Sequence, residues 1–302
     1  MQGTQTYKFA GRIYHDYLLG TLVRIRYRSI NLRKRLSGQN PVKTVLFYPD
    51  KPGYADVLYK VCNSMGYTMT SASDSQPDLV IAYEDVTERA PSRTLTELAA
   101  SHFVLNRRCH DIGKVNVERA FQEVFGYGTF VDPATHQGQC VVKSNENGSH
   151  DGEIIECPTQ SEREGAVFQR LINNVVGDEA LDIRVPIVGQ EIPFVYLKYR
   201  KLRSRFSNLN ARVSMDSAAA VFTSDEIKAI HGFVEELGLD YGELDVLRDR
   251  DDGRIYIVDV NNTPFGPPNH LPKADGRRAI GILSEAFDRQ FMTDTNKARD
   301  AR

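Results

Sequence analysis

Between residues 41 and 105, short apolar runs alternate with amphipathic stretches. Apolar runs typical of buried strands lie at 44–48, 67–70, 79–83 and 103–105. The segment 55–65 has helical periodicity and ends at Gly66, a residue type that favours helix termination. Strands that alternate with helices predict a small open α/β unit. No GxGxxG sequence follows the first strand, so we expect no dinucleotide site there.

From residue 106 the pattern predicts a larger unit that is rich in strands. An apolar stripe at 115–125 predicts a helix, and a second helix is expected at 224–237 with Ser224 as N-cap and Gly238 as C-cap. Strand patterns lie at 139–144, 153–157, 166–172, 181–189, 191–199, 242–248 and 254–260. The last two flank Asp251-Asp252-Gly253, a sequence that strongly favours the turn of a β-hairpin.

These patterns give a mixed α/β (α+β) chain in four parts. The expected parts are an arm at 1–40, the small α/β unit at 41–105, the larger domain at 106–292 and a frayed tail at 293–302.

The arm is strongly basic. Residues 1–43 hold nine cations and one acid, Asp16, which gives them a net charge of +8. Because the whole chain carries -2, residues 44–302 carry -10. Apolar and tyrosine side chains recur at helical spacing in the arm, which predicts a basic amphipathic helix. Such a helix can dock on its own acidic body, on a second subunit or on an anionic membrane. The apolar face is modest, so docking on protein is favoured and the membrane alternative stays open.

Composition excludes several classes of protein. A net charge of -2 and a pI near 6.4 argue against a general nucleic-acid binder. The four cysteines form no CxxC pair, so we predict neither a zinc ribbon nor a disulfide framework, and expect core cysteines. No apolar run is long enough for a transmembrane helix, and the N-terminus has no signal-peptide pattern. The expected location is the cytoplasm.

Three segments carry polar side chains that suit anionic ligands. Lys143 ends an apolar strand and is followed by a polar loop at 144–152, which contains Gly148, Ser149 and Gly152. Backbone N–H groups in such a loop can wrap a polyphosphate, although a surface hairpin turn has the same composition. Asp182 and Arg184 alternate out of a strand, as a cross-strand ion pair or a ligand site would. Five cations then lie between residues 198 and 205, including Arg200 and Arg205, and Asn208 follows them.

The sharpest pattern involves two carboxylates and an amide. Asp259 and Asn261 alternate out of an apolar strand, and Asp245 lies on the strand predicted to pair with it. Buried carboxylates on one face are costly unless they are paired or bind a metal. These hard oxygen ligands suit Mg²⁺ that keeps positions for water and phosphate.

In this order, the motifs resemble the ATP-grasp superfamily, and in particular its glutathione-synthetase and RimK-like ligases. The resemblance covers roughly residues 106–268. It implies that Asp245, Asp259 and Asn261 bind one or two Mg²⁺ ions, with Mn²⁺ as an alternative. It also assigns to ATP binding Lys114, Lys143, the loop residues Gly148, Ser149 and Gly152, the hinge residues Gln169, Arg170 and Ile172, the ribose-binding Asp182, and Asn208. Arg184, Arg200 and Arg205 are the cations expected to stabilise the negative charge of the transition state.

The resemblance implies an ATP- and Mg²⁺-dependent carboxylate–amine ligase that acts through an acyl phosphate. The expected partners are a small-molecule carboxylic acid and an amine, amino-acid-like or peptide-like, without nucleic acid; a homo-oligomer is left open. An ATP-grasp-type kinase and a non-catalytic nucleotide-binding scaffold are the alternatives. The chain departs from the family in having Asp259 where Glu is usual, and Gln169 where an acid is common.

Overall fold

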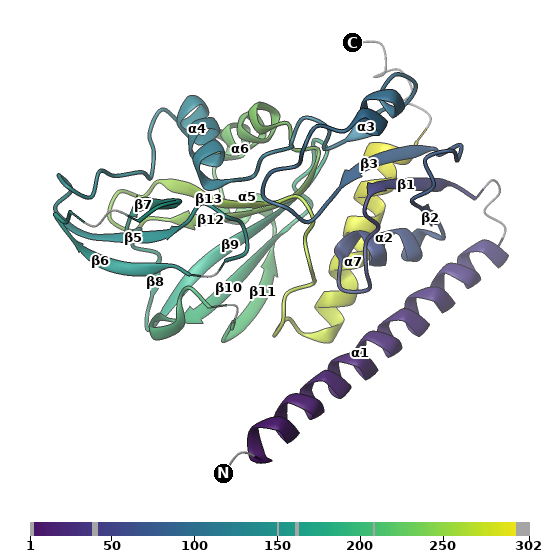
Figure 1. Cartoon of the computed structure of the whole chain (residues 1–302), viewed down its shortest axis with the longest axis horizontal. Coiled ribbons are helices and arrows are strands. Elements are labelled where there is room, and N and C mark those ends of the chain that lie inside the picture. The colour runs from purple at the N-terminus through teal and green to yellow at the C-terminus, as the bar shows by residue number, and fades with distance from the viewer. Residues whose placement is uncertain (1–2, 38–41, 150, 161–162, 208, 294–302) are drawn as a thin grey trace.

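The computed structural model describes residues 3–37, 42–149, 151–160, 163–207 and 209–293, with side chains from residue 20 onward (Figure 1). Asn208 and most of the predicted tail lie outside these residues. A long helix, α1 (Gly3–Leu36), precedes two units that each contain their own sheets. No helix in the described part of the chain is both long and apolar enough to cross a membrane.

The front unit is a parallel four-stranded sheet in the order β2-β1-β3-β4. Its elements are β1 (Thr44–Pro49), α2 (Val57–Met65), β2 (Thr68–Thr70), β3 (Leu79–Tyr83), α3 (Arg93–Leu98) and β4 (Val104–Leu105). The α2 helix ends at Gly66, whose φ of 80° is the left-handed conformation that the sequence predicted for a helix terminus.

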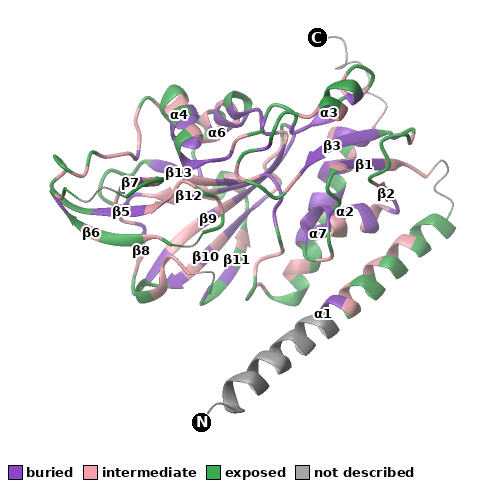
Figure 2. Cartoon of the chain, viewed as in Figure 1, coloured by how far each residue is buried: buried purple, intermediate pink, exposed green. Residues whose placement is uncertain are grey.

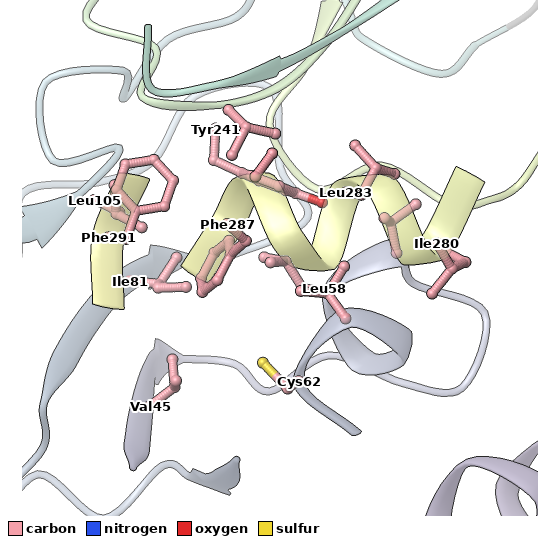
Figure 3. Packing of buried hydrophobic residues seen from close by; sticks show 14 of the residues in the cluster. Val45, Leu58, Cys62, Ile81, Leu105, Tyr241, Ile280, Leu283, Phe287 and Phe291 are labelled. Atoms are coloured by element: carbon pink, nitrogen blue, oxygen red, sulfur yellow. The ribbon is translucent and has the colours of Figure 1, made fainter. Parts of the chain in front are cut away.

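The front sheet is covered by the last helix of the chain as well as by its own helices. The α7 helix (Lys273–Phe287) and the η2 turn (Asp288–Met292) pack against α2 and β1 (Figure 3). Leu58 and Phe287 are both almost completely buried in this cluster. The chain therefore returns to the front unit after building the larger one, which ties the two units together.

The larger unit contains two sheets and three covering helices. A three-stranded antiparallel sheet, ordered β6-β5-β7, is formed by β5 (Gly138–Ser144), β6 (Glu153–Cys157) and β7 (Ala166–Arg170). A six-stranded sheet runs β11-β10-β9-β12-β13, with β8 paired to β9. Its strands are β8 (Val175–Val176), β9 (Glu179–Val188), β10 (Val195–Lys201), β11 (Arg212–Asp216), β12 (Tyr241–Arg248) and β13 (Ile255–Asn261). The remaining elements are α4 (Lys114–Phe125), η1 (Leu202–Ser204), α5 (Ala218–Val221) and α6 (Ser224–Leu237).

Helices α4 and α6 cover one face of the large sheet, and their apolar sides are buried there (Figures 1 and 2). The sequence prediction for the start of α6 was wrong by one residue. Thr223, not Ser224, is the N-cap. Its hydroxyl oxygen accepts a hydrogen bond from the Glu226 N–H, and the Glu226 carboxylate accepts one from the Thr223 N–H. All four cysteines are buried, which is the environment that the sequence predicted for Cys109, Cys140 and Cys157.

A buried carboxylate fixes the loop between α4 and β5. Glu118 on α4 accepts hydrogen bonds from the backbone N–H groups of Thr129 and Phe130 at 2.6 and 3.0 Å, and from the Thr129 hydroxyl. A Cβ atom on Gly128 would lie 2.3 Å from the Glu118 carboxylate, so only glycine allows this close approach. Thr129 in turn accepts a hydrogen bond from Gln169 on β7, so the network positions the segment that leads toward the hinge.

We expect Glu118→Ala to destabilise the fold by about 3 kcal/mol or more, because it leaves three donors in a dry environment without an acceptor. Glu123→Ala, an exposed acid on the same helix, is the matched control and should change stability by less than about 0.5 kcal/mol. Urea unfolding followed by circular dichroism measures both. Equal effects of the two substitutions would contradict the role given to this network.

Candidate nucleotide and metal site

A cavity of about 1110 Å³ lies where the small sheet, the large sheet and the front unit meet. All the site residues predicted from the sequence line it, except Asn208, which lies outside the described residues. Segments that are up to 147 residues apart in the sequence, from Lys114 to Asn261, are therefore brought to one place. The front unit contributes Tyr54 and Asp85 to its wall, and α1 contributes Val23.

The oxygen ligands predicted for a metal face this cavity from β12 and β13. The two strands are antiparallel, with Asp245 opposite Asp259 and Glu243 opposite Asn261. Directly opposite residues of an antiparallel pair share a face, so Asp259 and Asn261 lie on the same face as Asp245. A bulge after Asp245 shifts the register by one residue toward the hairpin. Burial raises the pKa of Asp259, although Lys114 and Lys143 oppose the shift.

Asp245 is held in an ion-pair network that the sequence did not reveal. Arg184 on β9 donates two hydrogen bonds of 2.9 Å to its carboxylate, and Lys198 on β10 lies 3.3 Å away. Burial alone would raise the pKa of Asp245, but these two cations outweigh it and hold the pKa well below its usual range. The carboxylate is therefore ionised across the ordinary pH range.

The donor set fits a hard cation. Among the described residues no three His, Cys, Asp or Glu side chains converge, so an ion here would rely on Asp245, Asp259, the Asn261 amide oxygen and oxygens of other ligands. Asn261 Oδ1 accepts one hydrogen bond, from the Thr263 N–H at 2.9 Å, and keeps a second lone pair. Asp245 has fewer lone pairs free for a cation, because its carboxylate already accepts hydrogen bonds from Arg184 and Lys198.

Two of the predicted catalytic arginines are engaged by carboxylates in this structure. Arg184 pairs with Asp245, and its Nη1 lies 3.4 Å from Glu243. Arg200 pairs with Asp182, the residue expected to hold ribose. Asp182 and Arg184 therefore each form an ion pair with a residue of a neighbouring strand, as the cross-strand interpretation of this segment predicted.

Arg205 has a different environment. It donates to the Ile172 carbonyl at 3.1 Å and to Asn174 Oδ1 at 2.7 Å, both of which are neutral. Among the described residues it forms no ion pair, so its charge is available to an anionic ligand at this end of the cavity.

Lys114 and Lys143 add further positive charge to the wall of the cavity. The Lys143 ammonium lies 3.3 Å from the Val258 carbonyl, and burial lowers its pKa to about 8 against the opposing effect of Asp259. Lys114 is buried and donates to the Glu146 carbonyl of the 144–152 loop at 2.7 Å. Both lysines are therefore desolvated and close to a cavity, which strengthens their interaction with any phosphate that enters.

The 144–152 loop joins β5 to β6 and touches three other parts of the chain. The Asn147 N–H donates to Thr87 Oγ1 of the front unit at 2.8 Å. Asn145 accepts from the first turn of α4. At the far end, Gly152 lies against Phe206, where a Cβ atom would be 2.8 Å from the ring. The loop is thus held across the cavity, and Gly148, with a φ of 72°, provides its turn.

The hinge residues take two roles. Gln169 is buried and bonds to Thr129, while Arg170 lines the cavity but directs its guanidinium to Asp249 and Asp252 of the β12–β13 hairpin. Ile172 is buried beside them. The Arg170 side chain therefore fixes the hinge to the large sheet.

Sequence analysis missed two polar groups of the site. Glu243 is buried, and desolvation raises its pKa to about 7 despite Arg184. Its spacing of two residues from Asp245 on one strand was the available signal. Asp85 follows β3 and accepts a hydrogen bond from Thr263 Oγ1 at 3.0 Å, which links the front unit to the segment after Asn261. No local pattern marks this second contact.

Comparison with known proteins gives the fold a name. No family model matches the sequence, and no curated protein matches it. The ATP-grasp ligase PsnB, solved with a minimal precursor, matches 82% of this chain and 98% of its own, with 15% identity and a TM-score of 0.53. D-alanine–D-alanine ligase from Bacillus anthracis covers 85% of this chain and 99% of its own at 14% identity and a TM-score of 0.52. A RimK-domain ATP-grasp protein from Sphaerobacter thermophilus covers 83% and 100% at 11% identity and 0.50. The chain has the ATP-grasp fold.

We expect Gly152→Ala to displace the 144–152 loop, because the new methyl group would overlap the Phe206 ring. Limited proteolysis should cut the loop faster in this variant, and the double variant Gly152→Ala with Phe206→Ala should return to the slower rate. Gly281→Ala, where no atom lies within 4 Å, is the matched control. A cleavage rate unaffected by Gly152→Ala would show that the contact with Phe206 does not hold the loop.

We expect Lys114→Met and Lys143→Met each to weaken binding of a non-hydrolysable ATP analogue about tenfold or more. Each removes a charge-assisted contact worth about 1.5–3 kcal/mol. Calorimetry with Mg²⁺ present measures the affinity, and Lys228→Met, an exposed cation on α6, should leave it unchanged. Unchanged affinity in both variants would return the two lysines to a purely structural role.

Proposed function

We propose that this chain, which has the ATP-grasp fold, is an ATP-dependent ligase that joins a carboxylate to an amine through an acyl phosphate. The observation that carries the proposal is the arrangement of charge in one cavity: two carboxylates and an amide oxygen lie beside Lys114 and Lys143, whose ammonium groups have no carboxylate partner among the described ion pairs. This arrangement suits a metal-bound polyphosphate.

The size of the cavity supports more than one substrate. Its volume of about 1110 Å³ exceeds the roughly 300–1000 Å³ of a typical single-ligand pocket. We place the triphosphate near Lys114 and Lys143, and a substrate carboxylate toward Arg205, at the opposite end. Mg²⁺, if bound by Asp245, Asp259 and Asn261, would neutralise phosphate charge and orient the γ-phosphate.

In the proposed reaction, a carboxylate oxygen of the substrate attacks the γ-phosphorus of ATP, and the bond to the β–γ bridging oxygen breaks. The products are ADP and an acyl phosphate. An amine then attacks the acyl carbon, phosphate leaves, and the amine gives up a proton. The residues of the chain bind, neutralise and orient the reactants, and none needs to act as a covalent nucleophile.

Exclusion of water is the second contribution of the chain, because an acyl phosphate hydrolyses readily. The 144–152 loop, held by Thr87 and by Phe206, covers the region beside Lys114. Ligases among the solved structures of this fold agree with the proposal, and the name of the D-alanine–D-alanine ligase suggests amino-acid substrates. A shared fold does not itself assign an activity, so the cavity carries the argument.

The test separates a ligase from a kinase. A panel of carboxylic acids, including amino acids and short peptides, is incubated with ATP, Mg²⁺ and hydroxylamine, and both ADP and hydroxamate are measured. A ligase forms hydroxamate in step with ADP, because hydroxylamine traps the acyl phosphate. ADP release that needs a hydroxyl substrate and yields no hydroxamate would establish a kinase instead. Firm ATP binding without turnover on any substrate would favour a scaffold.

With the substrate identified, we expect Asp259→Asn to lower turnover on the order of 100-fold or more, because it removes a charged metal ligand while keeping the shape of the side chain. Asp74→Asn makes the same charge change at an exposed loop position of the front unit and should retain full activity. Circular dichroism should show both variants folded. Near-normal turnover of Asp259→Asn at saturating ATP would rule out the metal assignment.

A further inference from the structure

The outer face of α1 carries a line of exposed apolar side chains. Leu22, Ile25, Leu32 and Leu36 are 62%, 57%, 57% and 77% exposed. Their spacings of three, seven and four residues place them on one side of a helix. These four are more than a third of the large apolar side chains that are exposed anywhere in the described residues, so the helix concentrates such surface. We call this line the apolar stripe.

The stripe points outward because the opposite face of α1 is fixed to the body. Tyr27 packs edge-on against Tyr59 of α2, with ring centroids 6.5 Å apart. Asn31 and Arg35 donate to the carbonyls of Tyr67 and Gly66 at 3.0 and 3.2 Å. The sequence favoured docking of the arm on protein, and α1 does dock on its own body, but with only one of its faces.

The approach of α1 to the body is closest near Gly20, at the N-terminal end of the described side chains. A Cβ atom on Gly20 would lie 2.7 Å from the Tyr54 ring, and Arg24 stacks over the same ring at 4.7 Å. These contacts set the rotation of the helix. Burying the stripe against the body would need a half-turn of α1 and the loss of every one of them.

Cations border the stripe on both sides. With about 100° between successive residues of a helix, Arg26 and Arg33 fall on one side of the stripe and Arg28 on the other, while Arg24 and Arg35 turn toward the body. Within residues 17–49 there is not one Asp or Glu. Asp16 is the one acid in residues 1–49, so the six cations at 24–35 outnumber the acids of their own helix by five. An apolar line with cationic borders is what this surface offers to a partner.

A second copy of the chain fits this surface poorly. If two stripes met, the bordering arginines of both helices would be brought together, with Asp16 as the one acid on each helix. An anionic phospholipid surface satisfies both features, because the leucines enter the boundary between headgroups and acyl chains while the arginines meet lipid phosphates.

We propose that α1 is a membrane-surface helix, through which this protein binds anionic phospholipid bilayers with the apolar stripe inserted at the interface. The helix lies in the plane of the surface and does not span it, in keeping with its content of charge. The proposal does not rest on the catalytic activity, because its test measures vesicle binding and substitutes no residue that lines the cavity.

The test uses the full-length protein and sedimentation with vesicles at about 0.15 M salt. One set of vesicles is phosphatidylcholine alone, and the other contains about 30% phosphatidylglycerol. We expect the wild type to sediment with the second set only. Arg28→Gln with Arg33→Gln should weaken partitioning about 25-fold, since each cation contributes a factor of about five at an anionic surface. Leu22→Gln, Ile25→Gln and Leu32→Gln together should weaken it at least about tenfold.

Matched controls remove the same groups elsewhere. Arg277→Gln with Arg278→Gln removes two exposed cations from α7, and Phe103→Gln with Ile154→Gln removes exposed apolar groups from the body. Neither should change vesicle binding. Full binding by the stripe variant would overturn the proposal, because it would leave only nonspecific charge attraction. So would a wild type that stays in solution with every vesicle, whether it self-associates through α1 or binds an acidic protein instead.

Discussion

The ion pair between Arg184 and Asp245 is the interaction around which the candidate site is organised. The two residues face each other across β9 and β12 in direct register, and two hydrogen bonds join them. An unpaired carboxylate at this depth would be costly, so the pair allows β12 to carry acids into the centre of the molecule. It also lets Asp259 lie opposite Asp245 without two uncompensated negative charges meeting across the ladder. Any cation that binds there enters a site in which one carboxylate is already neutralised.

The units on either side of the cavity are joined by ordinary packing and by single polar contacts. The α7 helix completes the core of the front unit, as Phe287 and Leu58 show. Thr263 bridges Asn261 and Asp85 through its backbone N–H and its hydroxyl. A displacement of the front unit would therefore be transmitted directly to a metal-ligand candidate.

Much of the fold could be read from the sequence because its signals are local. The run at 79–83 is fully buried as β3, and Gly238 ends α6 in the left-handed conformation. The pairing of β12 with β13 followed from the Asp-Asp-Gly hairpin. The resemblance that gathered Lys143, Asp245 and Asp259 into one site was carried by their order along the chain. The structure places these residues on one cavity, while their roles stay predictions.

The non-local features could not be read in this way. Nothing near Arg184 in the sequence indicates that its cross-strand partner is Asp245, because the choice depends on sheet order. The return of α7 to the front sheet and the Asp85–Thr263 contact join segments that are far apart in the chain. The outward direction of the apolar stripe likewise depends on where α1 docks, which periodicity alone does not determine.

Val23 places α1 in direct contact with the cavity. It lines the cavity from the same helix whose outer face carries Leu22 and Ile25, and its neighbour Arg24 rests on Tyr54, another wall residue. A tilt of the helix on a surface would therefore reshape the cavity wall. By thermodynamic reciprocity, a ligand that fills that end of the cavity would change the tilt and the grip of the helix by an equal free energy. How α1 lies on a surface would then depend on whether the cavity is occupied.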